Sequence, residues 1–182
     1  DATVPETYTL EAAGNAGCKT LLPHARARLR HGDQRSYLMF VLLRMFGQHK
    51  DRAAVPLLVA TDQEGGWIRH VKGATSETPG NMAIGASGLP YDAFRSAYYI
   101  GRELAALGVN MNFAPAVDLA TRPRSSIIGP RAFSDDPMTV AALGAAYVRG
   151  LAEAGVVATA KHFPGHGDTE LDSHGVLPVI WI

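Results

Sequence analysis

The chain has 182 residues, enough for one ordinary domain with a buried core. Its 17 basic side chains balance its 17 acidic ones, so no overall field favours nucleic acid or an anionic membrane as a partner. The single cysteine, Cys18, excludes an internal disulfide, and no apolar run reaches the roughly 18 residues that suggest a membrane span. We therefore expect one soluble domain whose ligand is small or neutral.

The first 50 residues show no clear order of elements. The run SYLMFVLLRMF, residues 36–46, is compatible with a strand and with a buried helix, because a short apolar run does not separate the two. The sequence assigns no element to this part of the chain.

Three apolar runs from residue 55 onward predict strands. VPLLVATDQEGG, residues 55–66, is apolar without alternation until its polar end, which is typical of a parallel strand covered on both faces. VNMNFAP, residues 109–115, and VVATAKH, residues 156–162, are the next two runs. Each of the three leads into polar residues.

Two amphipathic helices are predicted between these strands. Residues 92–107 place apolar side chains at spacings of three and four, and Gly108 follows where the helix should stop. Residues 137–154 repeat the design, with Asp136 as the N-cap and Pro137 at the first helical position.

Alternating strands and helices predict a parallel sheet with right-handed crossovers, either a doubly wound sheet or an eight-stranded α/β barrel. The periodicity does not choose between the two. A polar cluster follows the end of each strand, at residues 62–66, 118–131 and 161–174. In both architectures this edge of the sheet is where ligands bind.

The stretch KHFPGHGDTELDSHG, residues 161–175, concentrates titratable side chains on an irregular backbone. One interpretation is a metal site, since His162 and His166 have the i, i+4 spacing of ligands on a helix, but Pro164 breaks any helix between them. We therefore expect no metal. A structural role suits His166 and Asp168, because the neighbouring glycines are typical of a shaped loop.

A catalytic pair is the third interpretation of this stretch. Asp172 and His174 lie two residues apart, so their side chains share one side of an extended backbone. A carboxylate beside an imidazole fixes its tautomer and favours its protonated form, which suits general acid and base catalysis near neutral pH. Lys161 and His162, at the end of the third strand, are placed to donate hydrogen bonds to a polar ligand such as a sugar hydroxyl.

Three ordered motifs carry a family resemblance. KHFPGHGDTELDSHGVLP resembles the signature of bacterial glycoside hydrolase family 3 β-N-acetylglucosaminidases, which trim N-acetylglucosamine from muropeptides during cell-wall recycling. ATDQEGGWIRH resembles the family's first barrel loop, and LGVNMNFAPAVDLATRPRSSIIGPRAFSDDP its next long stretch. The resemblance covers about residues 55–180. It implies a (β/α)8 TIM-type barrel, of which residues 1–182 form a single, incomplete domain holding only the first part.

The resemblance implies a retaining glycosidase that forms a covalent glycosyl-enzyme intermediate. In such enzymes one group first protonates the leaving oxygen and then deprotonates water. The family assigns this acid/base role to a histidine paired with an aspartate on a mobile loop, and His174 and Asp172 match that pair. The spacing of Asp172 and His174 indicates the same pair.

Other matching positions are implied to bind the sugar ring. Asp62 matches an aspartate that accepts hydrogen bonds from sugar hydroxyls, and Arg131, Lys161 and His162 match residues that hold the same ring. Without the motifs, these residues would be a loop cap, a solvated arginine and a strand end with no ligand. Glu64, close to Asp62, is expected to be structural and to orient the loop.

The chain departs from the family at the first barrel loop. The family commonly has a basic residue at the position of His70, so His70 is a possible substrate-binding residue. Arg69 is a second possibility, because it could take over this contact if the loop shifts. Trp67 replaces what is frequently a smaller or basic residue, and it either stacks on a sugar or packs.

Family members are much longer than this chain, and their aspartate nucleophile lies on a later barrel strand. That nucleophile is not in this sequence, and Asp136 is explained as the N-cap already predicted. Because a retaining mechanism needs both a nucleophile and an acid, we expect the isolated chain to hydrolyse nothing efficiently.

Two other functions stay open at this point. A phosphorylase of the same family would use phosphate as the acceptor, which a histidine acid/base does not repel as a carboxylate would. A non-catalytic sugar-binding module would keep the binding residues, and its exposed strand edges would require a dimer, a partner chain or a repacked carboxyl terminus. In each case we expect an N-acetylglucosamine-containing glycan as the ligand, no cofactor, no nucleic-acid or membrane partner, and a cytoplasmic location.

Overall fold

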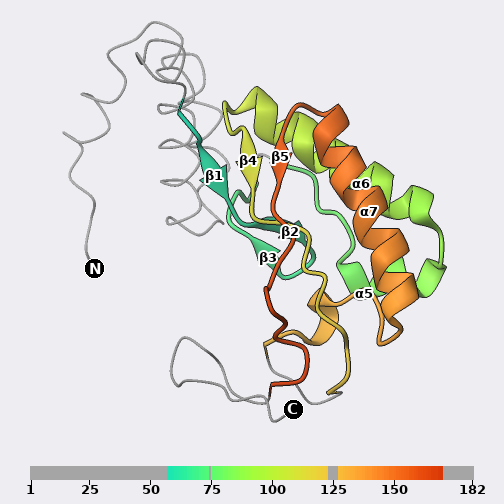
Figure 1. The fold of residues 1–182 in the computed structure, drawn as a ribbon. Helices are drawn as coiled ribbons and strands as arrows, with labels where there is room; N and C mark the ends of the chain where they lie inside the picture. The colour runs from blue at the N-terminus through green and yellow to red at the C-terminus, as the bar shows by residue number, and fades with distance from the viewer. Residues whose placement is uncertain (1–56, 74, 123–126, 170–182) are drawn as a thin grey trace, which may run out of the picture.

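The computed structural model describes residues 57–73, 75–122 and 127–169, drawn in colour in Figure 1. The elements, labelled as in that figure, are the strands β1 (Ala60–Thr61), β2 (Gln63–Gly65), β3 (Ile68–Arg69), β4 (Met111–Asn112) and β5 (Val157–Ala158), the helices α5 (Asn81–Ser87), α6 (Pro90–Ala106) and α7 (Pro137–Glu153), and the 3₁₀ turn η2 (Gly129–Arg131). None of the helices described here is long and apolar enough to cross a membrane.

Three parallel strands form the sheet that positions the candidate site. β1 pairs with β4 and β4 with β5, and Asn112 of β4 lies opposite Thr61 on one side and Ala158 on the other. Each strand therefore lies beside the one before it, with α6 crossing from β1 to β4 and α7 from β4 to β5. The predicted parallel sheet is confirmed, and this one-directional order is that of the first strands of a barrel as well as of one half of a doubly wound sheet.

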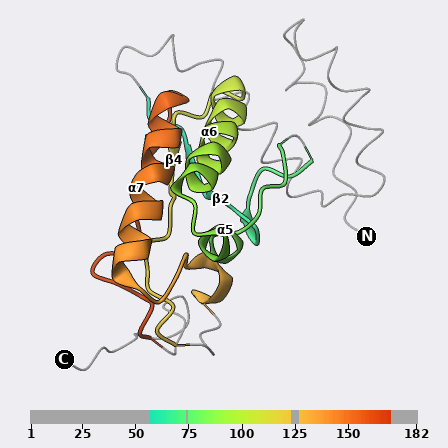
Figure 2. The ribbon, with the colours of Figure 1, turned by 90° about the vertical axis from the view of Figure 1, so that its right-hand side faces the viewer.

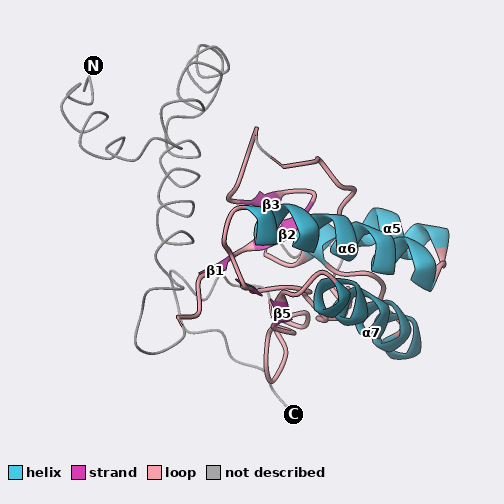
Figure 3. Ribbon diagram, turned by 90° about the horizontal axis from the view of Figure 1, so that it is seen from above, coloured by secondary structure: helices cyan, strands magenta, loops and turns pink. Residues whose placement is uncertain are grey.

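The helices α6 and α7 lie side by side on one face of the sheet, as Figures 2 and 3 show from two directions. Their inner surfaces form the core with the strands. Its fully buried members include Ala97 and Leu104 of α6, Leu143 and Leu151 of α7, and Val109 before β4. The apolar periodicity that predicted both helices is thus the pattern of the buried face.

Both helices begin close to where the sequence places them. The helix α7 starts at Pro137, and Asp136 is its N-cap, with the carboxylate accepting a hydrogen bond from the Thr139 backbone N–H at 2.7 Å. The helix α6 starts at Pro90, two residues before the predicted start, because a proline at the first helical position needs no hydrogen bond of its own. The predicted helices are confirmed.

The first predicted strand differs from expectation. The run 55–66 divides into β1 and β2, and β2 turns back to pair antiparallel with β3. The turn uses Gly65 and Gly66, whose φ angles are 93° and 55°, values that favour glycine. The prediction that this run is covered on both faces is wrong for Leu57 and Leu58, which are 46% and 68% exposed, since the described helices cover only one face of the sheet.

Candidate functional site

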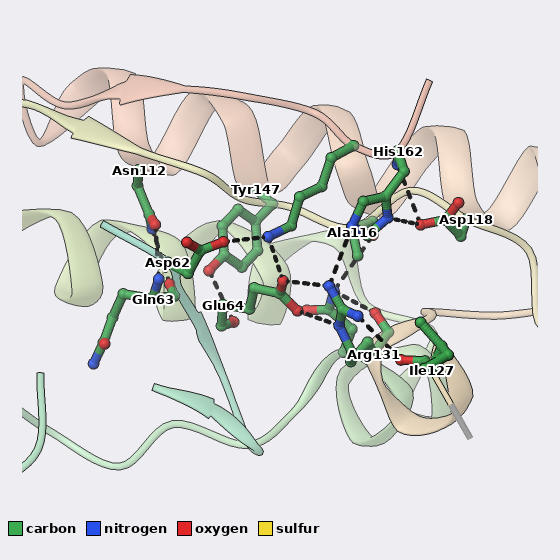
Figure 4. Close-up of polar contacts among 12 residues, drawn as sticks. Asp62, Gln63, Glu64, Asn112, Ala116, Asp118, Ile127, Arg131, Tyr147 and His162 are labelled. Carbon is green, nitrogen blue, oxygen red and sulfur yellow. Dashed lines mark hydrogen bonds and ion pairs between the residues drawn. The ribbon is translucent and has the colours of Figure 1, made fainter. Parts of the chain in front are cut away.

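The ends of the three parallel strands bring charged side chains together, as drawn in Figure 4. Asp62 directly follows β1, Asp118 lies beyond β4, and Lys161 and His162 lie beyond β5. The last two segments stay paired after the named strands end, because the Val117 backbone N–H donates to the Lys161 carbonyl at 2.7 Å. Parallel strands thus deliver these side chains to one edge of the sheet.

Hydrogen bonds with β4, with the Val71 backbone and with α7 hold the loop after β1 in place. The Gln63 backbone N–H donates to the Asn112 side chain at 3.0 Å, and the Asn112 amide donates back to the Gln63 carbonyl at 2.9 Å. The Gln63 side chain exchanges two hydrogen bonds with the Val71 backbone, and the Tyr147 hydroxyl of α7 donates to the Glu64 carbonyl at 3.0 Å. Since side chains alternate along extended chain, holding Gln63 on one side presents Asp62 and Glu64 on the other.

Two carboxylates and two cations form the centre of the site. Lys161 Nζ lies 2.7 Å from Asp62 Oδ1 and 2.6 Å from Glu64 Oε1. Arg131 donates to both oxygens of Glu64, from Nε at 3.0 Å and from Nη2 at 2.8 Å. The Glu64 side chain is only 3% exposed, so its charge is balanced by these two partners instead of by water.

Arg131 stays charged although it is largely buried. Burial by itself lowers the pKa of Arg131, but the hydrogen bonds and charge of Glu64, with the charges of Asp118 and Asp62, outweigh it and raise the pKa above its ordinary value. The guanidinium is therefore a permanent donor in the site.

A second pair, His162 and Asp118, adjoins this centre. The Asp118 carboxylate is fully buried and accepts hydrogen bonds from His162 Nδ1 at 2.6 Å, from the His162 backbone N–H at 3.2 Å and from the His166 backbone N–H at 2.6 Å. Burial by itself raises the pKa of Asp118, but these hydrogen bonds and the charge of His162 together lower it below its usual value.

The orientation of the His162 ring follows from its two neighbours. Arg131 Nη2 lies 3.3 Å from His162 Nε2, and an arginine has no acceptor atom. This contact is a hydrogen bond only in the tautomer that has a lone pair on Nε2 and its proton on Nδ1, toward Asp118. Both ring nitrogens have protein partners, and a sugar hydroxyl that reaches this ring meets an acceptor shared with Arg131.

The loop after His162 is shaped by its own side chains, as expected for His166 and Asp168. His166 is 8% exposed, its backbone is held by Asp118, and its ring contacts the Thr169 hydroxyl. Asp168 pairs with Arg122 at 3.0 Å on the exposed side. Within the part of the chain that the structure describes, no three His, Cys, Asp or Glu side chains are grouped as metal ligands would be.

Of the residues selected from the sequence, Asp62, Arg131, Lys161 and His162 lie together, and their role in sugar binding stays a prediction. Arg69 does not join them: its guanidinium pairs with Glu77 at 2.6 Å. The exposed His70 contributes its backbone N–H to the Asp62 carbonyl at 3.2 Å. The predicted catalytic pair, Asp172 and His174, lies outside the described residues.

Sequence reasoning passed over Asp118, the residue that orients His162. A signal was present, because Asp118 is the first charged residue after its strand, as Asp62 is after β1 and Lys161 is after β5. Asn112 carried a second signal, since a polar side chain inside an apolar strand implies a buried partner.

Comparison with known proteins places the chain among glycosidases. The model of the glycosyl hydrolase family 3 N terminal domain matches residues 33–181, which extends the family region well before residue 55. Beta-hexosaminidase A of Pseudoalteromonas piscicida is 47% identical over 135 residues, covering 71% of this chain and 22% of that protein. Beta-hexosaminidase of Xylella fastidiosa (strain M23) is 44% identical over 137 residues, covering 71% and 40%.

Solved structures agree with this placement. A glycoside hydrolase family 3 beta-N-acetylglucosaminidase from Paenibacillus sp. str. FPU-7 has a TM-score of 0.73 and 45% identity, over 78% of this chain and 28% of that one. Native NagZ from Neisseria gonorrhoeae has a TM-score of 0.69 and 32% identity, over 76% and 43%. The chain thus spans less than half the length of the proteins it resembles. Its sequence and its barrel-type fold both show that the chain belongs to glycosyl hydrolase family 3, where it matches the N-terminal domain.

Proposed function

We propose that this chain is the sugar-binding part of a retaining β-N-acetylglucosaminidase, in which Asp62, Arg131, Lys161 and His162 hold a terminal N-acetylglucosamine ring. The observation that carries the proposal is the convergence of these four side chains at one edge of the sheet, linked through Glu64. The names of the relatives, beta-hexosaminidase and beta-N-acetylglucosaminidase, support the identity of the sugar.

The network keeps polar atoms available for hydroxyl groups. Among the described residues, Lys161 uses two of its three N–H groups, and Arg131 uses four of its five, on Glu64, His162 and the Ile127 carbonyl. Toward the described part of the chain Asp62 engages Oδ1 alone, and its side chain is 33% exposed. One ammonium N–H, one guanidinium N–H and one carboxylate oxygen thus remain, which matches the paired donor and acceptor character of sugar hydroxyls.

The chemical step belongs to the predicted pair His174 and Asp172. His174 donates a proton to the leaving glycosidic oxygen and later accepts one from water, and Asp172 holds the ring and stabilises its charged form. The covalent intermediate requires a carboxylate nucleophile that these 182 residues do not supply. In the proposal, this chain by itself binds the sugar without turning over a glycoside.

Calorimetric titration of the chain with N-acetylglucosamine tests the binding role. Lys161→Met is expected to weaken binding at least about tenfold, because a hydrogen bond from a charged group is worth roughly 1.5–3 kcal/mol. Lys72→Met is the matched control, since Lys72 is exposed and lies outside the network. If Lys161→Met fails to fold, Asp62→Asn is the second variant to use, because it keeps the shape of the side chain.

Two results would overturn the binding role: no binding by the unaltered chain, or equal affinity in folded Lys161→Met and Lys72→Met. For the chemical step, the chain is incubated with p-nitrophenyl β-N-acetylglucosaminide, with and without phosphate. No p-nitrophenol release is expected. Release that requires phosphate would favour a phosphorylase, and release without phosphate would contradict the need for an additional nucleophile.

A further inference from the structure

A second pocket of about 370 Å³ lies next to the polar site and shares the Glu64–Arg131 pair with it. It opens between the turn of the β2–β3 hairpin, the start of α5 and the turn η2. Apart from that ion pair and Asn81, the described residues of its lining are apolar or glycine, and the largest of these side chains are Trp67, Met82 and Pro130. This volume and composition are those of ordinary small-molecule sites.

The pocket is preformed by close backbone contacts. A Cβ added to Gly66 would come 2.7 Å from the Gly80 Cα, so these glycines let the hairpin approach the start of α5. The Gly66 backbone N–H donates to the Thr78 carbonyl at 3.1 Å, and the Asn81 side chain donates to the Arg131 carbonyl at 2.8 Å. The hairpin, α5 and η2 are thus tied together, which lowers the entropy lost when a ligand binds.

Trp67 presents an unused aromatic face at this pocket. It is 76% exposed, and Met82 on the α5 side of the pocket is 45% exposed. Within the described residues the indole stacks on no other ring and lies under no cation, whereas the exposed tyrosines of α6 have arginine partners. A tryptophan offers a broad apolar surface with one N–H donor, which suits ligands that are apolar on one face and polar at the edge.

The charge of the lining limits the ligand class. Among the described residues that line it, the ionisable side chains are Glu64 and Arg131, and these neutralise each other at 2.8 Å. A charged ligand would be desolvated here without a counter-ion, so the pocket favours a neutral molecule. A pyranose ring meets both conditions, since its faces carry C–H groups and its edges carry hydroxyls.

We propose that this pocket binds a second sugar residue of the glycan, the one next to the terminal ring, with that second ring stacked on Trp67. The inference rests on the proposed function, because it takes the terminal sugar to lie at the Asp62 and Lys161 side of the shared Arg131. Trp67 differs from the basic or smaller residue expected from the family resemblance, so this contact is a property of this chain. It makes Trp67 a specificity-determining residue for neutral oligosaccharides.

The test compares the affinities of the chain for N-acetylglucosamine and for the disaccharide N,N′-diacetylchitobiose by calorimetric titration. The unaltered chain should bind the disaccharide more tightly. Trp67→Ala should weaken disaccharide binding about tenfold and leave monosaccharide binding unchanged, and Trp67→Phe should retain most of the disaccharide affinity. Tyr91→Ala, which removes an exposed aromatic ring of α6, is the control and should affect neither ligand.

The possible outcomes distinguish a failure of the second subsite from a failure of the proposed function. If the chain binds the monosaccharide and Trp67→Ala leaves the disaccharide affinity unchanged, the second subsite is wrong and the proposed function stands. If Trp67→Ala weakens both sugars equally, Trp67 acts on the terminal ring and the subsite is again wrong. If neither sugar binds the unaltered chain, both proposals fail.

Discussion

At the scale of single residues, the site depends on carboxylates that are buried together with their partners. Asp118 is the clearest case, because a fully buried carboxylate is tolerated only when its oxygens accept hydrogen bonds. Three donors from His162 and His166 meet that need and also tie the loop after β5 to the loop after β4. One aspartate therefore orients a site residue and anchors a loop.

Replacing Asp118 by Asn is expected to lower the free energy of unfolding by roughly 1.5–3 kcal/mol near pH 6, the usual range for hydrogen bonds to a charged group. Urea denaturation measures the change. Asp168→Asn is the control: Asp168 and its partner Arg122 are about half exposed, and such surface pairs contribute about 1 kcal/mol or less. Equal effects of the two variants would show that burial of Asp118 does not increase its contribution to the free energy of unfolding.

The same comparison has a predicted pH dependence. The folded-state pKa of Asp118 lies below its ordinary value of 3.8, so the folded protein holds this group ionised more strongly than the unfolded chain does. Its contribution is fully present well above pH 3.8 and is lost as the pH falls through the lower, folded-state value. The stability gap between the unaltered chain and Asp118→Asn should therefore shrink below about pH 4, and a constant gap down to pH 2.5 would contradict this assignment.

Position at a strand end selected Lys161 and His162 from the sequence, and the family resemblance added Asp62 and Arg131. Sequence spacing did not reveal which charged side chains form ion pairs with each other. Arg69 lies in β3 and Arg131 in η2; Arg131 reaches Glu64, while Arg69 pairs with Glu77. The Glu64–Arg131 pair joins residues 67 positions apart in the chain, so only the folded backbone decides it.

At the scale of elements, the packing of α6 against α7 depends on small residues at their contact. A Cβ added to Gly150 would come 2.3 Å from the Phe94 carbonyl oxygen and 2.9 Å from the Ala97 Cβ, and one added to Gly101 would come 2.6 Å from the Ala154 Cβ. Glycine at these positions lets the two backbones approach closely. That approach in turn places Tyr147 where its hydroxyl reaches the Glu64 carbonyl.

The variant Gly150→Ala tests whether the cost of closer packing exceeds the gain in helix propensity at this position. Propensity alone would stabilise α7 by about 1 kcal/mol, whereas overpacking typically costs about 1–3 kcal/mol. We expect the thermal midpoint to fall. The exposed Ala145→Gly in the same helix measures the propensity effect without the packing. A rise in the midpoint of Gly150→Ala would mean that the helices separate at little cost.

At the scale of the whole molecule, the described sheet has apolar edges. Val157 of β5 is 52% exposed and Phe163, just beyond it, is 98% exposed, while Leu58 before β1 is 68% exposed. Exposed strand edges with apolar side chains pair with other chains. The isolated chain is therefore expected to self-associate, in line with the dimer or partner chain anticipated from the sequence.

Light scattering coupled to size-exclusion chromatography tests this expectation. The average mass of the isolated chain should rise with concentration, and Val157→Lys should shift it toward the mass of one chain, because a lysine on an edge strand opposes edge pairing. Met138→Lys is the control, since Met138 is 75% exposed at the start of α7, away from the strands. Equal effects of both lysines would point to general solubility instead of edge pairing.

The sequence by itself determined the parallel strands, the positions of α6 and α7, the N-cap at Asp136 and the family. These features depend on local periodicity, capping chemistry and motif order, all of which are written in consecutive residues. Tertiary structure decided the rest: the turn of β2 onto β3, the Asp118–His162 pair, the isolation of Arg69 from the site and the pocket beside Trp67. Each of these depends on which distant segments meet when the strands align, and no local pattern carries that information.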